Sequence, residues 1–173
     1  MPELADLPAF VVRPARTSDV PKIARIVAGF ADNRRLLHKE TVTYYETVQE
    51  FRVAVDSVDR VVGCGALHVL WEDLAEVRTL AVDPAWHGRG VGHALLEELL
   101  AQGDQLGVSR LFCLTFEVDF FMRHGFQVIE GTPVQPEVYA ELLRSGDEGV
   151  AEFLDLARVK PNTLGNTRML RKL

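Results

Sequence analysis

Three glycines, Gly88, Gly90 and Gly92, alternate with other residues between Val82-Asp83-Pro84 and a run with helical spacing. Glycine lets the backbone turn sharply and lets a ligand approach the main-chain amides closely. The first four N–H groups of a helix have no partner inside the helix, and the helix dipole adds partial positive charge there. The spacing therefore predicts a phosphate-binding turn at the start of a helix.

Other interpretations of these glycines exist. A tight strand-to-helix connection without a ligand would use the same residues. A Rossmann dinucleotide turn follows the first strand of its unit and expects an acidic residue at the end of the next strand. Here several strands precede the glycines, and the strand expected at 110–115 ends without an acid. A P-loop is excluded because no Gly-Lys-Ser/Thr follows.

The elements that must position this turn follow from hydrophobic spacing and from turn residues. Strands are expected at 10–13, 51–55, 61–70, 74–82, 110–115, 126–129 and 167–173. Helices are expected through 23–30, 42–50, 120–124, 138–143 and 150–156, with N-cap chemistry at 17–19. A further helix, opened by the three glycines, has its apolar face over 91–100 and is expected to end at Gly103 or Gly107. The second, third and fourth strands are expected to form an antiparallel meander, in which Gly63 and Gly65 weaken the third.

Composition limits the class of protein. The 173 residues suit one domain, 1–173, and 19 Lys and Arg against 25 Asp and Glu give a net charge of −6. Such an acidic chain is not expected to bind nucleic acid. Two cysteines, Cys64 and Cys113, cannot form a metal cluster, and their apolar runs favour reduced thiols in the cytoplasm. No secretory signal and no membrane-spanning segment is expected.

Three separated motifs in the right order resemble the GNAT superfamily of N-acetyltransferases. The family signature Arg/Gln-x-x-Gly-x-Gly/Ala corresponds to His87-Gly88-Arg89-Gly90-Val91-Gly92, with His87 in place of the usual Arg or Gln. The later Phe-Tyr-x-x-x-Gly-Phe corresponds to Phe120-Phe121-Met122-Arg123-His124-Gly125-Phe126. The opening segment 12–20 is similar to the family's first strand and helix start.

A closer resemblance covers roughly residues 10–130. Residues 62–82, with 114–116 and 120–121, are similar to the short single-domain amino-acid acetyltransferases that make N-acetylglutamate for arginine synthesis. The amino-acid-kinase domain of the longer synthases is not expected in these 173 residues, and the resemblance implies nothing for the residues after Gly131. The resemblance implies a mixed α/β fold of the GNAT type, with a mostly antiparallel sheet, splayed fourth and fifth strands and flanking helices.

The resemblance also implies how the cofactor would be held. Acetyl-CoA, without a metal, is expected in the cleft between the splayed strands. Backbone groups of Leu80, Ala81 and Val82 would pair with the pantetheine arm and polarise the thioester carbonyl. The amides of His87, Gly88, Arg89, Gly90, Val91 and Gly92 would hold the pyrophosphate. Leu80 and Val82 can at the same time be ordinary core residues.

Acyl transfer to an amine needs a base, because an α-amino group is largely protonated near neutral pH. Glu76, four residues before Leu80, lies where many family members carry a catalytic glutamate. The alternative is that Glu76 is solvated or pairs with Arg78. Many relatives use a tyrosine as the acid where this chain has Phe121, so no acid is assigned. Cys113 is interpreted as a buried thiol rather than a nucleophile.

The substrate implied by the resemblance is L-glutamate or L-glutamine, whose carboxylate needs cations and donors. The candidates are Lys39 and Arg78, with Thr115 weaker, while Arg34 and Arg35 are more simply a solvated loop. His68 and Trp71 could line the same cleft. A protein N-terminus, a lysine or another small amine is the alternative acceptor, and a non-catalytic acyl-CoA sensor is the third hypothesis. No membrane partner is expected, and the oligomeric state stays open, with a homodimer as one option.

Overall fold

The structure is a computed structural model that describes residues 9–31 and 39–173. Its strands are β1 (Phe10–Pro14), β2 (Phe51–Asp56), β3 (Val61–Trp71), β4 (Leu74–Val82), β5 (Arg110–Thr115), β6 (Gln127–Val128) and β7 (Thr167–Lys172). Its α-helices are α1 (Val20–Ala31), α2 (Thr41–Glu46), α3 (Val91–Leu106), α4 (Val118–Arg123), α5 (Pro136–Leu142), α6 (Glu148–Phe153) and α7 (Lys160–Thr163). Short 3₁₀ turns lie at Thr17–Asp19, Val48–Glu50, Pro84–Trp86 and Ala157–Val159.

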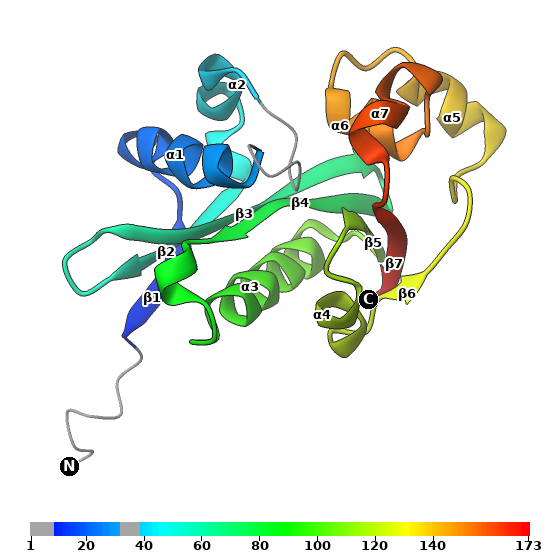
Figure 1. Cartoon of the computed structure of the whole chain (residues 1–173). Helices are drawn as coiled ribbons and strands as arrows, with labels where there is room; N and C mark the ends of the chain where they lie inside the picture. The colour runs from blue at the N-terminus through cyan, green and yellow to red at the C-terminus, as the bar shows by residue number, and fades with distance from the viewer. Residues whose placement is uncertain (1–8, 32–38) are drawn as a thin grey trace. The chain divides into compact units, whose positions relative to one another are not determined.

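The strands form one mixed sheet in the order β1-β2-β3-β4-β5-β7-β6 (Figure 1). The pairs β1/β2, β2/β3, β5/β7 and β6/β7 are antiparallel. The pair β4/β5 is parallel, as expected for two strands joined by a helical crossover through α3. Its register begins at Leu74 and Arg110 and ends at Glu76 and Phe112, although both strands continue. The predicted mixed α/β fold with a mostly antiparallel sheet is confirmed.

Contacts divide the chain into two compact units. The first runs to Leu67 and resumes at Thr79–Gln102, and the second comprises His68–Arg78 and Gly103–Leu173. Strand β4 contributes to both, since the division falls between Arg78 and Thr79. A single domain over 1–173 stays a prediction.

In the first unit, the alternation of side chains along β2 sets the packing. Successive residues of a strand point to opposite faces of the sheet. Val53 belongs to the same buried cluster as Ile23 of α1, whereas its neighbour Ala54 belongs to the cluster of Leu95 in α3. The pattern therefore places α1 and α3 on opposite faces of β2 and β3, as Figure 1 shows.

Two glycines of β3 allow α3 to lie directly on the sheet. A Cβ atom at Gly63 would lie 2.9 Å from Val91 Cγ1 and 3.0 Å from Leu95 Cδ1. A Cβ atom at Gly65 would lie 3.0 Å from Leu99 Cδ1. These glycines were expected only to weaken the strand. The structure shows why glycine occupies these two positions: α3, which begins at Val91, lies too close to β3 for a side chain.

The start of α1 is organised by a buried carboxylate rather than by a simple N-cap. Thr17–Asp19 form a 3₁₀ turn, and the Asp19 carboxylate accepts hydrogen bonds from the Arg16 backbone N–H and from Arg13 Nη1, each at 2.7 Å. Burial alone would raise the pKa of Asp19, but these hydrogen bonds and the charge of Arg13 lower it below its ordinary value. The buried Asp19 is therefore held as the ion.

In the second unit, β5 and β7 pair along their whole length, from Arg110–Lys172 to Thr115–Thr167. The adjoining core contains Leu74, Phe112 and Phe153, and the last two rings meet edge to face at 4.9 Å. Phe153 belongs to α6, so the helical segment after β6 is fastened to the sheet by apolar packing. The helices expected at 138–143 and 150–156 are present as α5 and α6. Each starts two residues earlier than expected, and they end one and three residues earlier, at Leu142 and Phe153.

The helix expected over 42–50 is divided in two. α2 ends at Glu46, and Val48–Glu50 form a 3₁₀ turn. The Thr47 hydroxyl donates to the Thr43 carbonyl at 2.7 Å, a local bond of the kind that disturbs a regular helix. No helix among residues 9–31 and 39–173 is long and apolar enough to span a bilayer.

The close approach at β3 predicts a clear contrast between two glycine-to-alanine variants. Gly63→Ala should lower the free energy of unfolding by about 1–3 kcal/mol, because the added methyl group overlaps α3 side chains. Gly29→Ala is the matched control within α1, where a Cβ atom meets nothing within 4 Å. It should raise stability by up to about 1 kcal/mol through helix propensity. Denaturant unfolding measures both, and equal stability of the two variants would contradict the packing argument.

Candidate active site

The glycine turn predicted from the sequence lies between β4 and α3 in the first unit. After the 3₁₀ turn at Pro84–Trp86, Gly88 and Gly90 have φ angles of +76° and +81°. Left-handed residues alternating with ordinary ones turn successive N–H groups towards one point, which makes an anion-binding concavity. The first bond of the helix runs from Ala94 N to Gly90 O at 3.0 Å, so the preceding amides belong to the helix start.

Side chains around the turn fold back on the protein. His87 Nε2 lies 3.0 Å from the Val82 carbonyl oxygen, which ties the turn to the end of β4. The Arg89 guanidinium stacks over the Trp86 ring at 4.8 Å, and Trp86 meets Phe10 edge to face at 6.5 Å. Gly88, Arg89 and Gly90 are exposed, so a ligand can reach their main chain. His87 thus has a structural contact here although the family usually has Arg or Gln.

Thr79 in β4 has a backbone conformation that sequence reasoning missed. Its φ angle is +57°, which is strained for a β-branched residue and is found mostly at functional sites. The Thr79 hydroxyl accepts a hydrogen bond from Lys39 Nζ at 3.1 Å, and its carbonyl lies 3.5 Å from the Cys64 thiol. Regular strand geometry is therefore interrupted immediately before Leu80. No local sequence signal marks a threonine for this conformation.

Lys39 is joined to β4 through Thr79, which places one predicted substrate residue beside the strand of Leu80, Ala81 and Val82. Ala81 is buried and belongs to the α1 cluster, while Leu80 and Val82 belong to the α3 cluster. The core role foreseen for these side chains is thus observed. Among their backbone groups, the Val82 carbonyl oxygen is already contacted by His87. Arg34 and Arg35 lie outside the described residues.

In the second unit, Glu76, Arg78 and Asp147 form a row of ion pairs. Arg78 donates to Glu76 Oε2 from Nη2 at 2.7 Å and from Nε at 3.2 Å, and from Nη1 to the Asp147 carboxylate at 2.9 Å. The side chains of Glu76 and Arg78 are only 5% and 10% exposed. The pairing of Glu76 with Arg78, one of the two alternatives left open by the sequence, is therefore present. Asp147 was not foreseen.

The charges in this row stabilise one another. Burial would lower the pKa of Arg78, but the two carboxylates raise it above its ordinary value. Burial would likewise raise the pKa of Asp147, but the hydrogen bond from Arg78 lowers it to about 2. Arg78 has five N–H groups, of which these bonds use three. The remaining two are the ones that the predicted substrate role of Arg78 would require.

The other candidates in the second unit have structural contacts. The Thr115 hydroxyl accepts a hydrogen bond from the Glu117 backbone N–H at 2.8 Å. Burial, with the charge of Glu76, raises the pKa of the Cys113 thiol well above its ordinary value, which disfavours the nucleophilic thiolate. Phe121 is buried and meets Phe126 edge to face at 5.1 Å.

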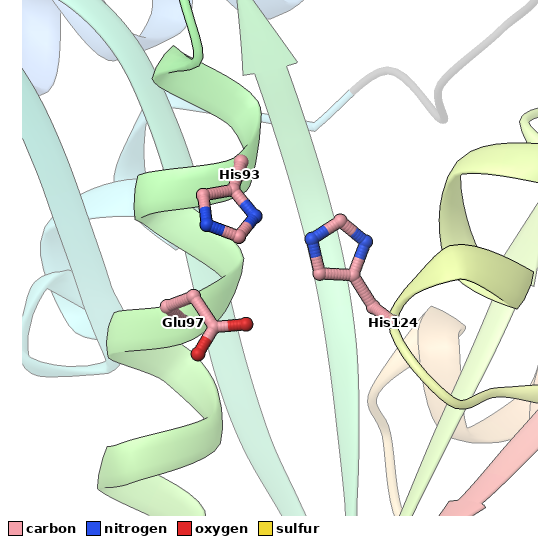
Figure 2. Close-up of side chains that lie close together, drawn as sticks. All are labelled: His93, Glu97 and His124. Atoms are coloured by element: carbon pink, nitrogen blue, oxygen red, sulfur yellow. The ribbon is translucent and has the colours of Figure 1, made fainter.

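Two side chains able to bind a metal lie on α3. His93 and Glu97 occupy successive turns of that helix, and Figure 2 shows them projecting from the same side of it. His124, also drawn in Figure 2, belongs to the other unit, where its Nδ1 lies 2.8 Å from the Phe120 carbonyl oxygen. These two ligands from one helix are fewer than the three protein ligands that catalytic zinc sites use.

Comparison with known proteins places this geometry in a family. The acetyltransferase (GNAT) domain family matches residues 47–128. A Mycobacterium tuberculosis protein named amino-acid acetyltransferase is 60% identical over 162 residues, which is 92% of this chain and 92% of that protein.

Solved structures agree with the sequence comparison. A crystal structure of a M. tuberculosis protein in complex with CoA and the ligand NLQ has a TM-score of 0.92 and 60% identity, over 94% of this chain and 99% of that one. N-acetylglutamate synthase of Neisseria gonorrhoeae, complexed with coenzyme A and N-acetyl-glutamate, has a TM-score of 0.75 at 23% identity. It covers 95% of this chain but 35% of the synthase, and shows the fold alone. The near-full-length match at 60% identity, with the glycine turn and the mixed sheet, shows that this chain belongs to the GNAT family of acetyltransferases.

Proposed function

We propose that this chain transfers the acetyl group of acetyl-CoA to the α-amino group of L-glutamate or L-glutamine, the first step of arginine biosynthesis. The observation that carries the proposal is the near-full-length similarity to a protein named amino-acid acetyltransferase. The run at 62–82, which is similar to short enzymes that make N-acetylglutamate, supports the choice of substrate. The reaction is acyl transfer from sulfur to nitrogen and uses no metal. The protein would act in the cytoplasm, where Cys64 and Cys113 stay reduced.

The glycine turn fits the pyrophosphate of the cofactor. A net charge of −6 does not attract anions to the chain as a whole, so an anionic cofactor needs a local site. Exposed amides at Gly88, Arg89 and Gly90, with those of Val91 and Gly92, offer donors at a helix start. The amide of His87, also predicted for this role, instead donates to the Pro84 carbonyl oxygen at 3.3 Å. Backbone groups of Leu80–Val82 would hold the pantetheine arm and polarise the thioester carbonyl.

Glu76 is the proposed base. The substrate α-amine must lose a proton before its nitrogen attacks the thioester carbon, and a carboxylate can take that proton directly or through a water molecule. The nitrogen–carbon bond forms and the carbon–sulfur bond breaks, CoA leaves as the thiolate, and the nitrogen gives up its second proton to solvent. A thiol has an ordinary pKa of about 8.5, so this thiolate can take a proton from solvent. Phe121 has no hydroxyl group to donate one, and no side chain is assigned as the acid.

The carboxylates of the amino acid would be bound by cations on β4 and beside it. Arg78 has two N–H groups beyond those it gives to Glu76 and Asp147, and Lys39 is held at Thr79. Thr115 adds a hydroxyl group at the end of β5. This set suits an anionic amino acid better than a cationic acceptor such as lysine.

A substrate panel tests the proposal. The purified protein, incubated with acetyl-CoA and each amino acid in turn, should release free thiol fastest with L-glutamate or L-glutamine. Saturation by a peptide or a small amine instead would assign another acceptor. Thermal stabilisation by CoA without turnover would indicate a non-catalytic sensor.

The phosphate site predicts the effect of one charge at the turn. Gly90→Asp should abolish CoA binding in a calorimetric titration, because it adds bulk and negative charge where the pyrophosphate would lie. Gly131→Asp is the matched control, since Gly131 also has a positive φ, +74°, and open space around its Cα. The control introduces the same strain and charge and should bind CoA normally. Normal affinity of Gly90→Asp would refute the assignment.

The base proposal predicts a pH-dependent loss in Glu76→Gln. Its kcat at pH 7 should fall by about a hundredfold or more while the KM for acetyl-CoA changes little. The deficit should narrow as the pH rises, because the amine then loses its proton without help. Steady-state rates across the pH range measure this, and a profile identical to that of the unmodified protein would remove Glu76 as the base.

A further inference from the structure

The segment after β6 reaches back to the strand that carries Glu76. Residues beyond 128 lie outside the GNAT family match, and the resemblance in sequence gave them no role. Within the second unit, however, Asp147 and Gly149 at the start of α6 both approach Arg78 of β4. Asp147 and Arg78 are 69 positions apart in the chain. The segment after β6, which lies outside the family match, thus contacts Arg78, the ion-pair partner of Glu76.

Asp147 has two bonds that define its position. Its carboxylate accepts from the Val150 backbone N–H at 2.8 Å, which caps α6, and from Arg78 Nη1 at 2.9 Å. The cap fixes the carboxylate relative to the helix, and α6 is fastened by Phe153, which is fully buried. Asp147 therefore presents a fixed acceptor to the guanidinium.

Gly149 closes the other side of the guanidinium. A Cβ atom at Gly149 would lie 2.5 Å from Arg78 Nη2 and 2.6 Å from Arg78 Cζ. No side chain fits there unless Arg78 moves. The nitrogen nearest to this position, Nη2, is the one that donates to Glu76 at 2.7 Å. Any displacement of Arg78 from Gly149 therefore changes the hydrogen bond that orients Glu76.

We propose that Asp147 and Gly149 are positioning residues, which hold Arg78 so that it fixes the Glu76 carboxylate in the orientation needed to take a proton from the amine. This inference rests on the proposed function, in which Glu76 is the base. A reacting group displaced by 1 Å can lose about a hundredfold in rate, so a contact two side chains away can govern turnover. Asp147 and Gly149 themselves touch neither the substrate nor the cofactor in this proposal.

The first test uses Asp147→Asn and its neighbour Glu148→Gln. Asparagine caps a helix as well as aspartate does, so the exchange keeps α6 and removes the charge that faces Arg78. It should lower kcat between about tenfold and a hundredfold and leave the KM for acetyl-CoA unchanged. Glu148 pairs at 2.7 Å with exposed Arg158 instead, so Glu148→Gln should keep kcat unchanged. A loss confined to the KM for the amino acid would overturn the inference, because Asp147 would then serve substrate binding.

The second test is steric and leaves every charge in place. Gly149→Ala should lower kcat to a similar extent, because the methyl group displaces the guanidinium. Gly146→Ala is the matched control, since a Cβ atom there meets nothing within 4 Å. A melting curve for each variant verifies that it is folded at the assay temperature. Unchanged kcat in both Gly149→Ala and Asp147→Asn overturns the inference.

A double-mutant cycle with Glu76→Gln separates positioning from general destabilisation. If Asp147 acts through the Glu76 carboxylate, Asp147→Asn should have little further effect on kcat once Glu76 is glutamine. Multiplying losses would mean that the two residues act independently and would overturn the inference. Full activity of Glu76→Gln alone would instead refute the base role in the proposed function, and the inference with it. Loss in Glu76→Gln with none in either Asp147→Asn or Gly149→Ala leaves the base role standing and rejects the positioning role only.

Discussion

Main-chain N–H groups at the start of α3 are the donors on which the proposed cofactor site depends. A net charge of −6 makes the chain a poor receptor for anions through side chains alone, whereas unpaired amides and the helix dipole act whatever the surface charge. The turn needs the positive φ angles of Gly88 and Gly90, and the helix behind it needs Gly63 of β3 to seat Val91 on the strand. The glycines of the turn and of β3 therefore meet the same requirement, which is that the start of α3 stays exposed while the helix packs on the sheet.

Strand β4 has to provide two kinds of group. Its last residues, Leu80–Val82, would offer backbone to the cofactor, while Glu76 and Arg78 offer side-chain charge. The left-handed Thr79 stands between the two sets and costs about 1–3 kcal/mol of strain. Lys39 and Cys64 both contact Thr79, so the contacts around it help to hold a conformation that the strand would otherwise avoid. The interruption separates the part of the strand assigned to chemistry from the part assigned to binding.

Local patterns predicted most of the fold, and contacts between distant residues account for what they missed. The apolar stripe of α3 and the parallel strand after it follow directly from spacing and from the crossover they require. Gly63 looked like a weak point in a strand, because the sequence does not show which helix will pack against it. The helix divides at Thr47, whose hydroxyl donates to the Thr43 carbonyl, and the helical pattern of the sequence does not mark this division.

For the candidate site, the spacing of the glycines predicted the turn and the family resemblance singled out Glu76, whereas residue type left open whether Glu76 is solvated or pairs with Arg78. The structure shows Arg78 bound to two carboxylates, and only one of these, Glu76, is a near neighbour in sequence. Asp147 could be recognised locally as a helix cap, because an aspartate precedes a short helical run. Its second bond, to a residue 69 positions away, has no local signature.

The row Glu76–Arg78–Asp147 also explains why a segment outside the family match can matter for chemistry. A buried carboxylate and guanidinium each lose hydration, and the pair is favourable only when the remaining donors find partners. Arg78 is a long side chain with several rotamers, so a single bond to Glu76 would leave its position poorly defined. A second carboxylate, capped on a helix that Phe153 anchors, restricts those rotamers from the opposite end. In the proposed mechanism, the orientation of Glu76 would therefore depend on the packing of α6 as well as on its own strand.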